Sequence, residues 1–303
     1  MGEMKTAILP WGERTFVMGV INVTPDSFSG DGLLAERAGE TGDLFLAALS
    51  QARRFADEGA DIVDIGGEST RPGAQPISEQ EELARVVPAV KAVASAGLNI
   101  FISVDTSKGA VADAALEAGA HLVNDVCGLR ADPTMAEVVA RHQAPVILMH
   151  NRLKPASAEV QARLGGRYVG AKYTNLLENI KTDLEECITL ARAAGIPYSH
   201  IILYPGIGFG KTVEQNLELL DRLDELRSLG YPLLVGPSRK SFIGYTLDLP
   251  PDQRIEGTAA AVAISIARRV DIVRVHDVGM MVRVVRMSDA IVRRKSVPVV
   301  RGD

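Results

Sequence analysis

The stretch Ile100–Asp125, IFISVDTSKGAVADAALEAGAHLVND, contains the pattern that decides the fold. A nearly apolar run, Ile100–Val104, ends at the polar residue Asp105. A helical segment follows, and Gly119 separates it from a second short apolar run, His121–Val123. Glycine at that position suits the left-handed residue that often closes a helix. The stretch therefore predicts a buried strand, a helix and a second buried strand.

The same alternation continues along the whole chain. Nearly continuous apolar runs are typical of parallel strands that are buried on both faces. Eight such strands, each followed by a helical segment and with no change of composition, predict one (β/α)8 TIM barrel over residues 1–303. Its core spans about 15–295, and 296–303 is expected to be a flexible tail; an open doubly wound sheet is the alternative. The expected strands are Thr15–Ile21, Ile62–Ile65, Ile100–Val104, His121–Val123, Val146–Met149, Ile201–Leu203, Pro232–Val235 and Ile272–Val275.

Several helix boundaries can be predicted from local signals. Thr212 with Gln215 has the spacing of a capping box and opens a periodic segment that extends to Leu226. Asp132 followed by Pro133 predicts an N-cap and a proline in the first helical position. Glycines are expected in the left-handed conformation after helices; they are Gly59, Gly97, Gly119, Gly195 and Gly230.

Composition limits the class of protein. The 303 residues include 33 Lys and Arg against 38 Asp and Glu, a net charge of −5, and 47% are hydrophobic. This balance argues against binding to nucleic acid or to a membrane surface, which needs a basic face. The two cysteines, Cys127 and Cys187, do not form a CxxC pair, which fits a reducing cytoplasm. No apolar segment is long enough and unbroken enough to predict a membrane span.

Unusual polar residues follow almost every expected strand, where a barrel places its chemistry. Arg71, Lys240, Arg274 and His276 would converge on one mouth, and together they suit a polyanion such as a pyrophosphate. Separate surface salt bridges are the plainer interpretation of these cations. Asp105 and Asn124 suit a flat heterocycle with N–H donors, or else they form structural hydrogen bonds to neighbouring strands.

The glycine-rich segment Gly206–Thr212 superficially suggests a nucleotide loop. A Walker A loop needs a glycine where Pro205 stands, and a GxGxxG motif needs one where Lys211 stands. Both nucleotide-binding interpretations therefore fail on spacing. His121, inside an apolar strand, is expected to be a packed or capping histidine.

The polar segments resemble the dihydropteroate synthases, the folate-pathway enzymes that sulfonamides inhibit. The resemblance extends from about Phe16 to Val292. It rests on six segments taken together, and each alone would be weak. They are Met18–Ser29, Asp64–Gly73, Ser103–Thr106, Asn124–Val126, Ser238–Phe242 and Arg274–Val278.

The resemblance implies a reaction and its requirements. The amine of p-aminobenzoate displaces pyrophosphate from 6-hydroxymethyl-7,8-dihydropterin pyrophosphate, and the product is 7,8-dihydropteroate. An enzyme of this kind clamps the leaving anion, excludes water and holds the amine nearby. The resemblance also implies Mg²⁺ as cofactor and a cytoplasmic homodimer.

The resemblance also assigns roles to residues. Asn22 would help to bind Mg²⁺ on the pyrophosphate. Arg71, Arg274 and His276 would hold the diphosphate oxygens, and Asp105, Asn124 and Lys240 would face the pterin ring. The p-aminobenzoate site would be bordered by Thr70, Pro72, Phe209, Lys240 and Ser241. The loops that carry Asp26–Asp31 and Glu68–Gly73 would close over the reactants.

Two positions depart from the family pattern. Tyr204 stands where the family usually has an aspartate that accepts N–H bonds from the pterin, and a neutral phenol cannot replace those two bonds. The first loop reads Ser29-Gly30-Asp31-Gly32, which moves its aspartate by one position. Three functions stay open: an active synthase impaired by Tyr204, a pterin-binding paralogue with little catalysis, and a methyltetrahydrofolate-type pterin methyltransferase. The segments Glu68–Gly73 and Ser238–Phe242 favour the synthase over the methyltransferase.

Overall fold

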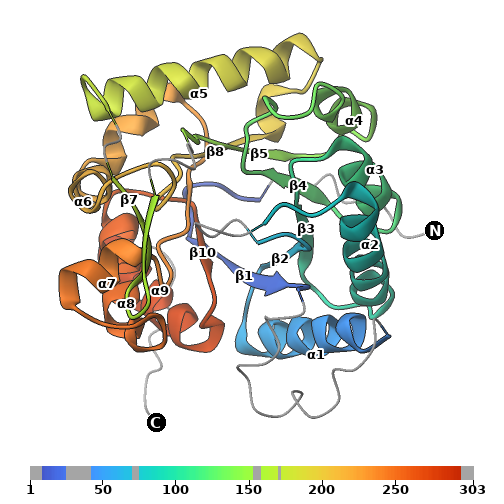
Figure 1. Ribbon diagram of the computed structural model, residues 1–303, viewed down its shortest axis with the longest axis horizontal. Coiled ribbons are helices and arrows are strands. Elements are labelled where there is room, and N and C mark those ends of the chain that lie inside the picture. The colour runs from blue at the N-terminus through green and yellow to red at the C-terminus, as the bar shows by residue number, and fades with distance from the viewer. Residues whose placement is uncertain (1–8, 25–41, 70–74, 153–157, 170–171, 295–303) are drawn as a thin grey trace.

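The computed structural model describes residues 9–24, 42–69, 75–152, 158–169 and 172–294. Within these ranges, eight parallel strands form one sheet with helices around it (Figure 1). The strand order is β8-β5-β4-β3-β2-β1-β10-β9, and a parallel bridge between Leu203 and Leu233 joins the two outer strands. The predicted TIM barrel is therefore confirmed, and the doubly wound alternative is wrong.

The strands lie where the apolar runs predict them. They are β1 (Phe16–Asn22), β2 (Ile62–Gly66), β3 (Phe101–Asp105), β4 (Leu122–Asp125), β5 (Val146–Met149), β8 (Ile201–Tyr204), β9 (Leu234–Val235) and β10 (Ile272–Val275). Several continue by one residue beyond the apolar run, so that Asn22, Asp105 and Tyr204 are the last residues of their strands.

The helices alternate with these strands and cover the outside of the barrel. They are α1 (Gly42–Glu58), α2 (Glu79–Ser95), α3 (Gly109–Glu117), α4 (Met135–Arg141), α5 (Leu176–Ala193), α6 (Val213–Asp221), α7 (Ser241–Leu247), α8 (Ile255–Ala267) and α9 (Val278–Val292). Among the described residues, no helix is both long and apolar enough to cross a membrane.

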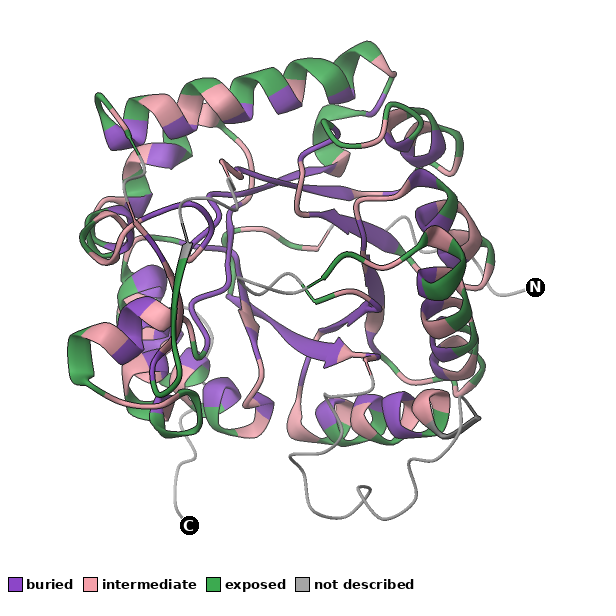
Figure 2. Ribbon diagram, viewed as in Figure 1, coloured by how far each residue is buried: buried purple, intermediate pink, exposed green. Residues whose placement is uncertain are grey.

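Alternation along each strand divides the core into two layers. In β1, Phe16 and Met18 point into the barrel with Ile147 and Ile272, whereas Val17 lies in the larger layer between strands and helices. Figure 2 shows the result: the eight strands of the barrel are mostly buried, and the helices are buried along their inner faces. Side chains at alternate strand positions therefore reach the interior of the barrel.

Most local signals are confirmed and two are wrong. Thr212 and Gln215 form the predicted capping box, and the five glycines have φ between 64° and 112°. The helix that Thr212 opens ends at Asp221, and a 3-10 segment, Leu223–Leu229, replaces its expected last turn. Asp132 is not the N-cap of α4, which begins at Met135 after Thr134. Its Oδ1 still accepts the Thr134 N–H, two residues ahead, and its Oδ2 accepts the Gly109 N–H at the start of α3, so one carboxylate joins the two helix starts.

An antiparallel hairpin that the sequence pattern did not predict follows β5. It consists of β6 (Ala158–Gln161) and β7 (Gly165–Tyr168) and lies against α7. The Tyr245 hydroxyl donates to the Gly165 carbonyl at 3.2 Å. The buried Arg254 guanidinium donates to the Leu164 and Arg239 carbonyls. The hairpin is thereby tied to the segment that carries Lys240 and Ser241.

Candidate active site

Arg274 lies between two carboxylates at the centre of the barrel. It projects inward from β10; its Nε donates to Asp64 on β2 and its Nη2 to Asp105 on β3, both at 2.6 Å. Asn124 of β4 donates to the same Asp64 oxygen at 2.9 Å. Four strands therefore bring Asp64, Asp105, Asn124 and Arg274 into one polar cluster, which we call the lumen cluster.

Burial sets the protonation of the lumen cluster. Burial raises the pKa of Asp105 to about 7, because desolvation outweighs the attraction of Arg274 and the nearby Asp64 carboxylate adds to the rise. The pKa of Arg274 lies above its usual range. Burial lowers this pKa, but attraction by the Asp64 and Asp105 carboxylates outweighs the effect of burial. Arg274 is therefore a fixed cation, whereas Asp105 changes its charge near neutral pH.

Several buried acceptors in this region lack a hydrogen-bond partner among the described residues. Asp64 Oδ1 and Asn124 Oδ1 belong to the lumen cluster. The Ser103 hydroxyl is on β3, two residues before Asp105. Buried polar atoms are nearly always paired, so an unpaired set in a barrel interior favours a ligand with N–H donors. A flat heterocycle with an amino group would meet this requirement.

Tyr204 lies in the barrel interior on the β8 side, near Asp64, Asp105 and Arg274 of the lumen cluster. It is 1% exposed, its ring meets Phe209 edge to face at a centroid distance of 6.5 Å, and its hydroxyl has no partner among the described residues. The hydroxyl lies so close to Gly236 that a Cβ atom there would overlap it. Burial raises the pKa of Tyr204 well above its usual value, so the phenol is neutral and can donate a hydrogen bond.

Lys240 lies over the face of the buried Phe209 ring. Its Nζ is 4.0 Å from the ring centroid, a cation–π distance, and its stem packs on Gly208. Ser241, the next residue, is half-buried at the first position of α7. Phe209 and Lys240 therefore pack together beside Tyr204, and Ser241 directly follows Lys240 at the start of α7.

His276 follows β10 and faces the loop after β9. Its Nδ1 lies 3.0 Å from the Ser238 hydroxyl, which also accepts the His276 backbone N–H at 3.2 Å. The neighbouring Arg239 donates from Nε to Asp277 at 3.0 Å. Hydrogen bonds thus tie together the two loops that contribute Lys240 and His276.

The remaining site predictions concern the first two loops. Asn22 ends β1 opposite Gly66 in the sheet register and is half-buried. Thr70, Arg71 and Pro72, and the loop at Asp26–Asp31, lie outside the described residues. His121 accepts the Ile102 N–H at 2.9 Å, as expected of a capping histidine.

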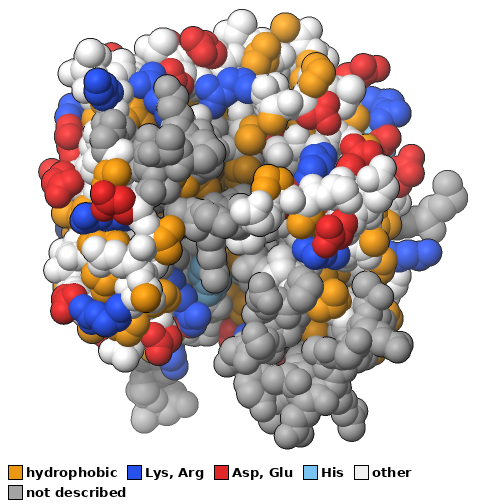
Figure 3. Space-filling view, viewed as in Figure 1, with side chains coloured by type: hydrophobic (Ala, Val, Ile, Leu, Met, Phe, Trp, Pro, Cys, Tyr) orange, Lys and Arg blue, Asp and Glu red, His pale blue; other side chains and the backbone are white. Residues whose placement is uncertain are grey.

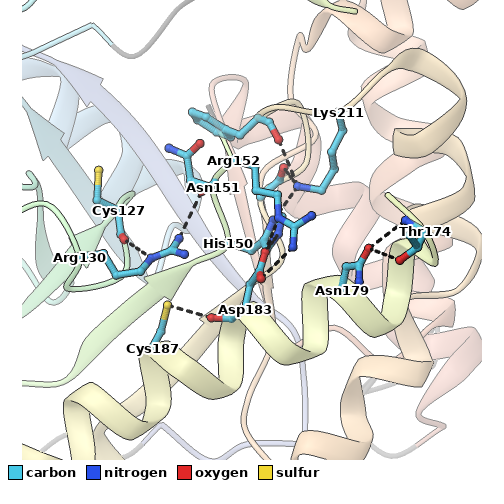
Figure 4. A network of polar contacts seen from close by, with 12 residues as sticks. Cys127, Arg130, His150, Asn151, Arg152, Thr174, Asn179, Asp183, Cys187 and Lys211 are labelled. Carbon is cyan, nitrogen blue, oxygen red and sulfur yellow. Dashed lines mark hydrogen bonds and ion pairs between the residues drawn. The ribbon is translucent and has the colours of Figure 1, made fainter. Parts of the chain in front are cut away.

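Sequence reasoning missed several polar residues of the site. Asp64 and Ser103 each stand inside an apolar strand at a position that alternation points inward, and this signal could have identified both. Lys211 was considered only as part of a rejected nucleotide loop; it is 2% exposed and bonded to His150 (Figure 4). A buried lysine cannot be recognised from its neighbours in sequence.

Charges on the rim are mixed. On the face seen in Figure 3, the described Lys and Arg side chains alternate with Asp and Glu and do not gather into one basic surface. Among the described residues, no group of three His, Cys, Asp or Glu side chains is placed to hold a metal ion. The described part of this face therefore offers no continuous basic surface to an extended polyanion.

Comparison with known proteins agrees with this geometry. Residues 18–276 match the family model described as pterin binding enzyme. A dihydropteroate synthase from Clostridium beijerinckii is 48% identical over 284 residues, which cover 93% of this chain and 96% of the relative. A Clostridium difficile dihydropteroate synthase, crystallised in the presence of pteroic acid, superposes with a TM-score of 0.83 at 44% identity, covering 94% of this chain and 99% of that one. The Xanthomonas albilineans dihydropteroate synthase with 4-aminobenzoic acid superposes with a TM-score of 0.81 at 38% identity, covering 94% of this chain and 95% of that one.

Proposed function

The chain belongs to the dihydropteroate synthases, a family of pterin-binding enzymes, and we propose that the residues around its lumen cluster perform the condensation of that family. In this reaction the C–O bond between the pterin CH₂ and the pyrophosphate breaks. The p-aminobenzoate nitrogen forms the new bond to that carbon and loses one proton. The products are 7,8-dihydropteroate and pyrophosphate.

The pterin ring binds at the lumen cluster. The observation that carries this assignment is the set of unpaired buried acceptors, Asp64 Oδ1 and Asn124 Oδ1, beside the Arg274–Asp105 pair. These oxygens suit the N–H groups of an aminopyrimidinone ring, and the Lys240 ammonium lies near enough to attract the Asp105 charge. Rigid acceptors of this kind orient the ring and exclude water before any bond breaks.

The diphosphate binds at the carboxyl ends of the strands, where cationic side chains are found. Arg274, Arg71 and His276 hold its oxygens, because charge-assisted donors stabilise an anion that departs with additional negative charge. Arg274 Nε and Nη2 are engaged by carboxylates, which leaves Nη1 as the donor for the substrate. The p-aminobenzoate ring lies against Phe209, Lys240 and Ser241, together with Thr70 and Pro72.

A divalent cation, Mg²⁺, fits the site only together with substrate. The carboxamide oxygen of Asn22 is a hard, neutral ligand that Mg²⁺ accepts, but one such group binds the ion weakly. The pyrophosphate would provide the other oxygens, and the ion would neutralise the charge of the leaving group. Asn22 is the residue of this chain that would hold it.

Assembly and location complete the proposal. Exposed apolar side chains gather on α8 and α9, among them Ile264, Met287 and Ile291, and these support a homodimer. The absence of paired cysteines supports a cytoplasmic enzyme. The expected substrates are small molecules, and the mixed surface charge argues against nucleic acid and membrane partners.

Tyr204 favours a second candidate function. Its ring fills the barrel interior next to the lumen cluster, where a neutral phenol replaces the aspartate that the resemblance implies. A paralogue that binds pterins with little turnover would tolerate this change. Mass spectrometry separates the two candidates: the synthase forms dihydropteroate from both substrates, whereas the paralogue binds the pterin and forms none.

A further inference from the structure

Lys211 is a buried cation for which the proposed reaction has no role. It follows the turn Gly206–Gly210 after β8, and it is 2% exposed. Its Nζ lies 3.0 Å from His150 Nδ1, 3.0 Å from the Gly206 carbonyl oxygen and 3.1 Å from the Phe209 carbonyl oxygen. An ammonium has three N–H donors, so these three acceptors match its full hydrogen-bonding capacity.

His150, which accepts from Lys211, is itself oriented by Asp183. Its Nε2 lies 2.9 Å from Asp183 Oδ2 on α5, and Asp183 also accepts Arg152 Nε at 2.6 Å and Nη2 at 2.9 Å (Figure 4). Burial, with the neighbouring Lys211 charge, lowers the pKa of His150 to about 3, so its ring is neutral. The Nε2–H therefore donates to Asp183, and the free Nδ1 lone pair accepts from Lys211.

The turn that Lys211 binds supports the proposed p-aminobenzoate site. Gly206 and Gly208 have φ of 72° and 79°, and a Cβ atom on Gly206 would collide with the His150 carbonyl. Lys211 binds the carbonyl oxygens of Gly206 and Phe209 in this turn, while the Lys240 side chain packs on Gly208 and on the Phe209 ring. Asn216 of α6 also holds the turn, because its Oδ1 accepts the Gly208 N–H at 2.7 Å.

We propose that Lys211 is a positioning residue: through its bonds to Gly206, Phe209 and His150 it fixes the turn that holds Phe209 beneath Lys240, and so shapes the site for the aromatic amine. The inference rests on the proposed function. It predicts a larger effect on the amine than on the pterin, because the four residues of the lumen cluster lie on other strands and only Lys240, among the proposed pterin contacts, packs on this turn.

The inference also predicts a dependence on pH. Burial lowers the pKa of Lys211 to about 7, and the charged groups that face it are Asp183 of α5, Arg152 after β5, and Lys240 before α7, with neutral His150 at contact. A neutral amine has only two N–H donors, so one of its three acceptors loses its bond as Lys211 deprotonates. The turn should therefore loosen as pH rises through about 7.

The test compares Lys211→Met with the wild type and with Lys91→Met, a control at an exposed position of α2. Hydrogen exchange in the free protein should accelerate at Gly208 and Phe209 in Lys211→Met alone. The KM for p-aminobenzoate should rise roughly tenfold or more, while the KM for the pterin pyrophosphate rises by a clearly smaller factor. The wild-type KM for the amine should also rise above pH 7, and this dependence should vanish in the variant.

Asp183→Asn supplies a second variant in case Lys211→Met does not fold. It weakens the orientation of His150 and should shift exchange and KM in the same direction by a smaller factor. Unchanged exchange at the turn, or an equal rise of KM for both substrates, would overturn the inference. A wild-type chain that forms no dihydropteroate would instead refute the proposed function, and exchange alone would then decide the role of Lys211.

Discussion

Replacing Tyr204 with aspartate tests how the lumen recognises its ligand. The phenol is almost fully buried, its hydroxyl is unpaired among the described residues, and its ring lies between Phe209 and the lumen cluster. An aspartate would replace this bulk with two acceptor oxygens that can pair with pterin N–H groups. Two charge-assisted bonds of this kind amount to about 3–5 kcal/mol, or roughly two to four decades in kcat/KM.

The same change should cost stability in the free protein. Loss of a buried aromatic ring removes about 3–5 kcal/mol from the free energy of unfolding when the site does not collapse. The new carboxylate would also lie near Asp64 and Asp105, whose repulsion Arg274 offsets only in part. We therefore expect Tyr204→Asp to be less stable without ligand and more active with it.

The assay is pyrophosphate release at varied pterin concentration, with thermal unfolding of the same samples. Tyr204→Phe is the matched control, because it keeps the ring and removes only an unpaired hydroxyl. It should leave activity low and stability equal or slightly higher. If Tyr204→Asp and Tyr204→Phe have the same kcat/KM, Tyr204 does not occupy the pterin space and this reasoning is refuted.

Four further predictions follow from the site. Arg274→Ala should weaken the binding of pyrophosphate-bearing pterins far more than the binding of the bare pterin, since each charge-assisted contact contributes about 1.5–3 kcal/mol. Equal losses of affinity in calorimetry would show that Arg274 does not bind the diphosphate. Mg²⁺ should bind weakly to the free protein and clearly once pyrophosphate is present, and a tight site in the free protein would contradict the role of Asn22. Sulfonamides should bind only after pyrophosphate or the pterin substrate, because these complete the p-aminobenzoate site; strong binding to the empty protein would exclude this order. Asp105 has a folded-state pKa raised from 3.8 to about 7, so the stability linked to its protonation is complete below pH 4 and is lost as pH rises to 7; unfolding scans should show Asp105→Asn with a flatter pH dependence in that window.

The sequence predicted the elements whose signals are local. Strand positions followed from apolar runs, because a strand buried on both faces leaves no polar positions except those that point into the lumen. The left-handed glycines followed from the backbone conformation that each helix end requires. Asp105, Asn124 and Arg274 were predicted from their places at or near strand ends, and the structure brings all three together.

The parts that sequence did not predict depend on contacts between distant segments. Asp132 was expected to be the N-cap of its own helix, but α4 begins three residues later, and its carboxylate also accepts the Gly109 N–H of α3, which is distant in sequence. The hairpin that starts at Ala158 is held by Tyr245 and Arg254, whose positions become known only in the folded chain. The role of Lys211 could not be predicted, because its three acceptors come from two loops that meet only in the folded chain.

The most direct test of the central claim is a crystal structure with the dihydropterin pyrophosphate bound. We expect the pterin ring in the barrel interior, with its N–H groups on Asp64 or Asp105 and on Asn124, and the diphosphate against Arg274 and His276. Tyr204 should then contact the ring edge or turn away from it. A pterin bound outside the lumen, with the lumen cluster unchanged and Tyr204 still closing it, would contradict the claim.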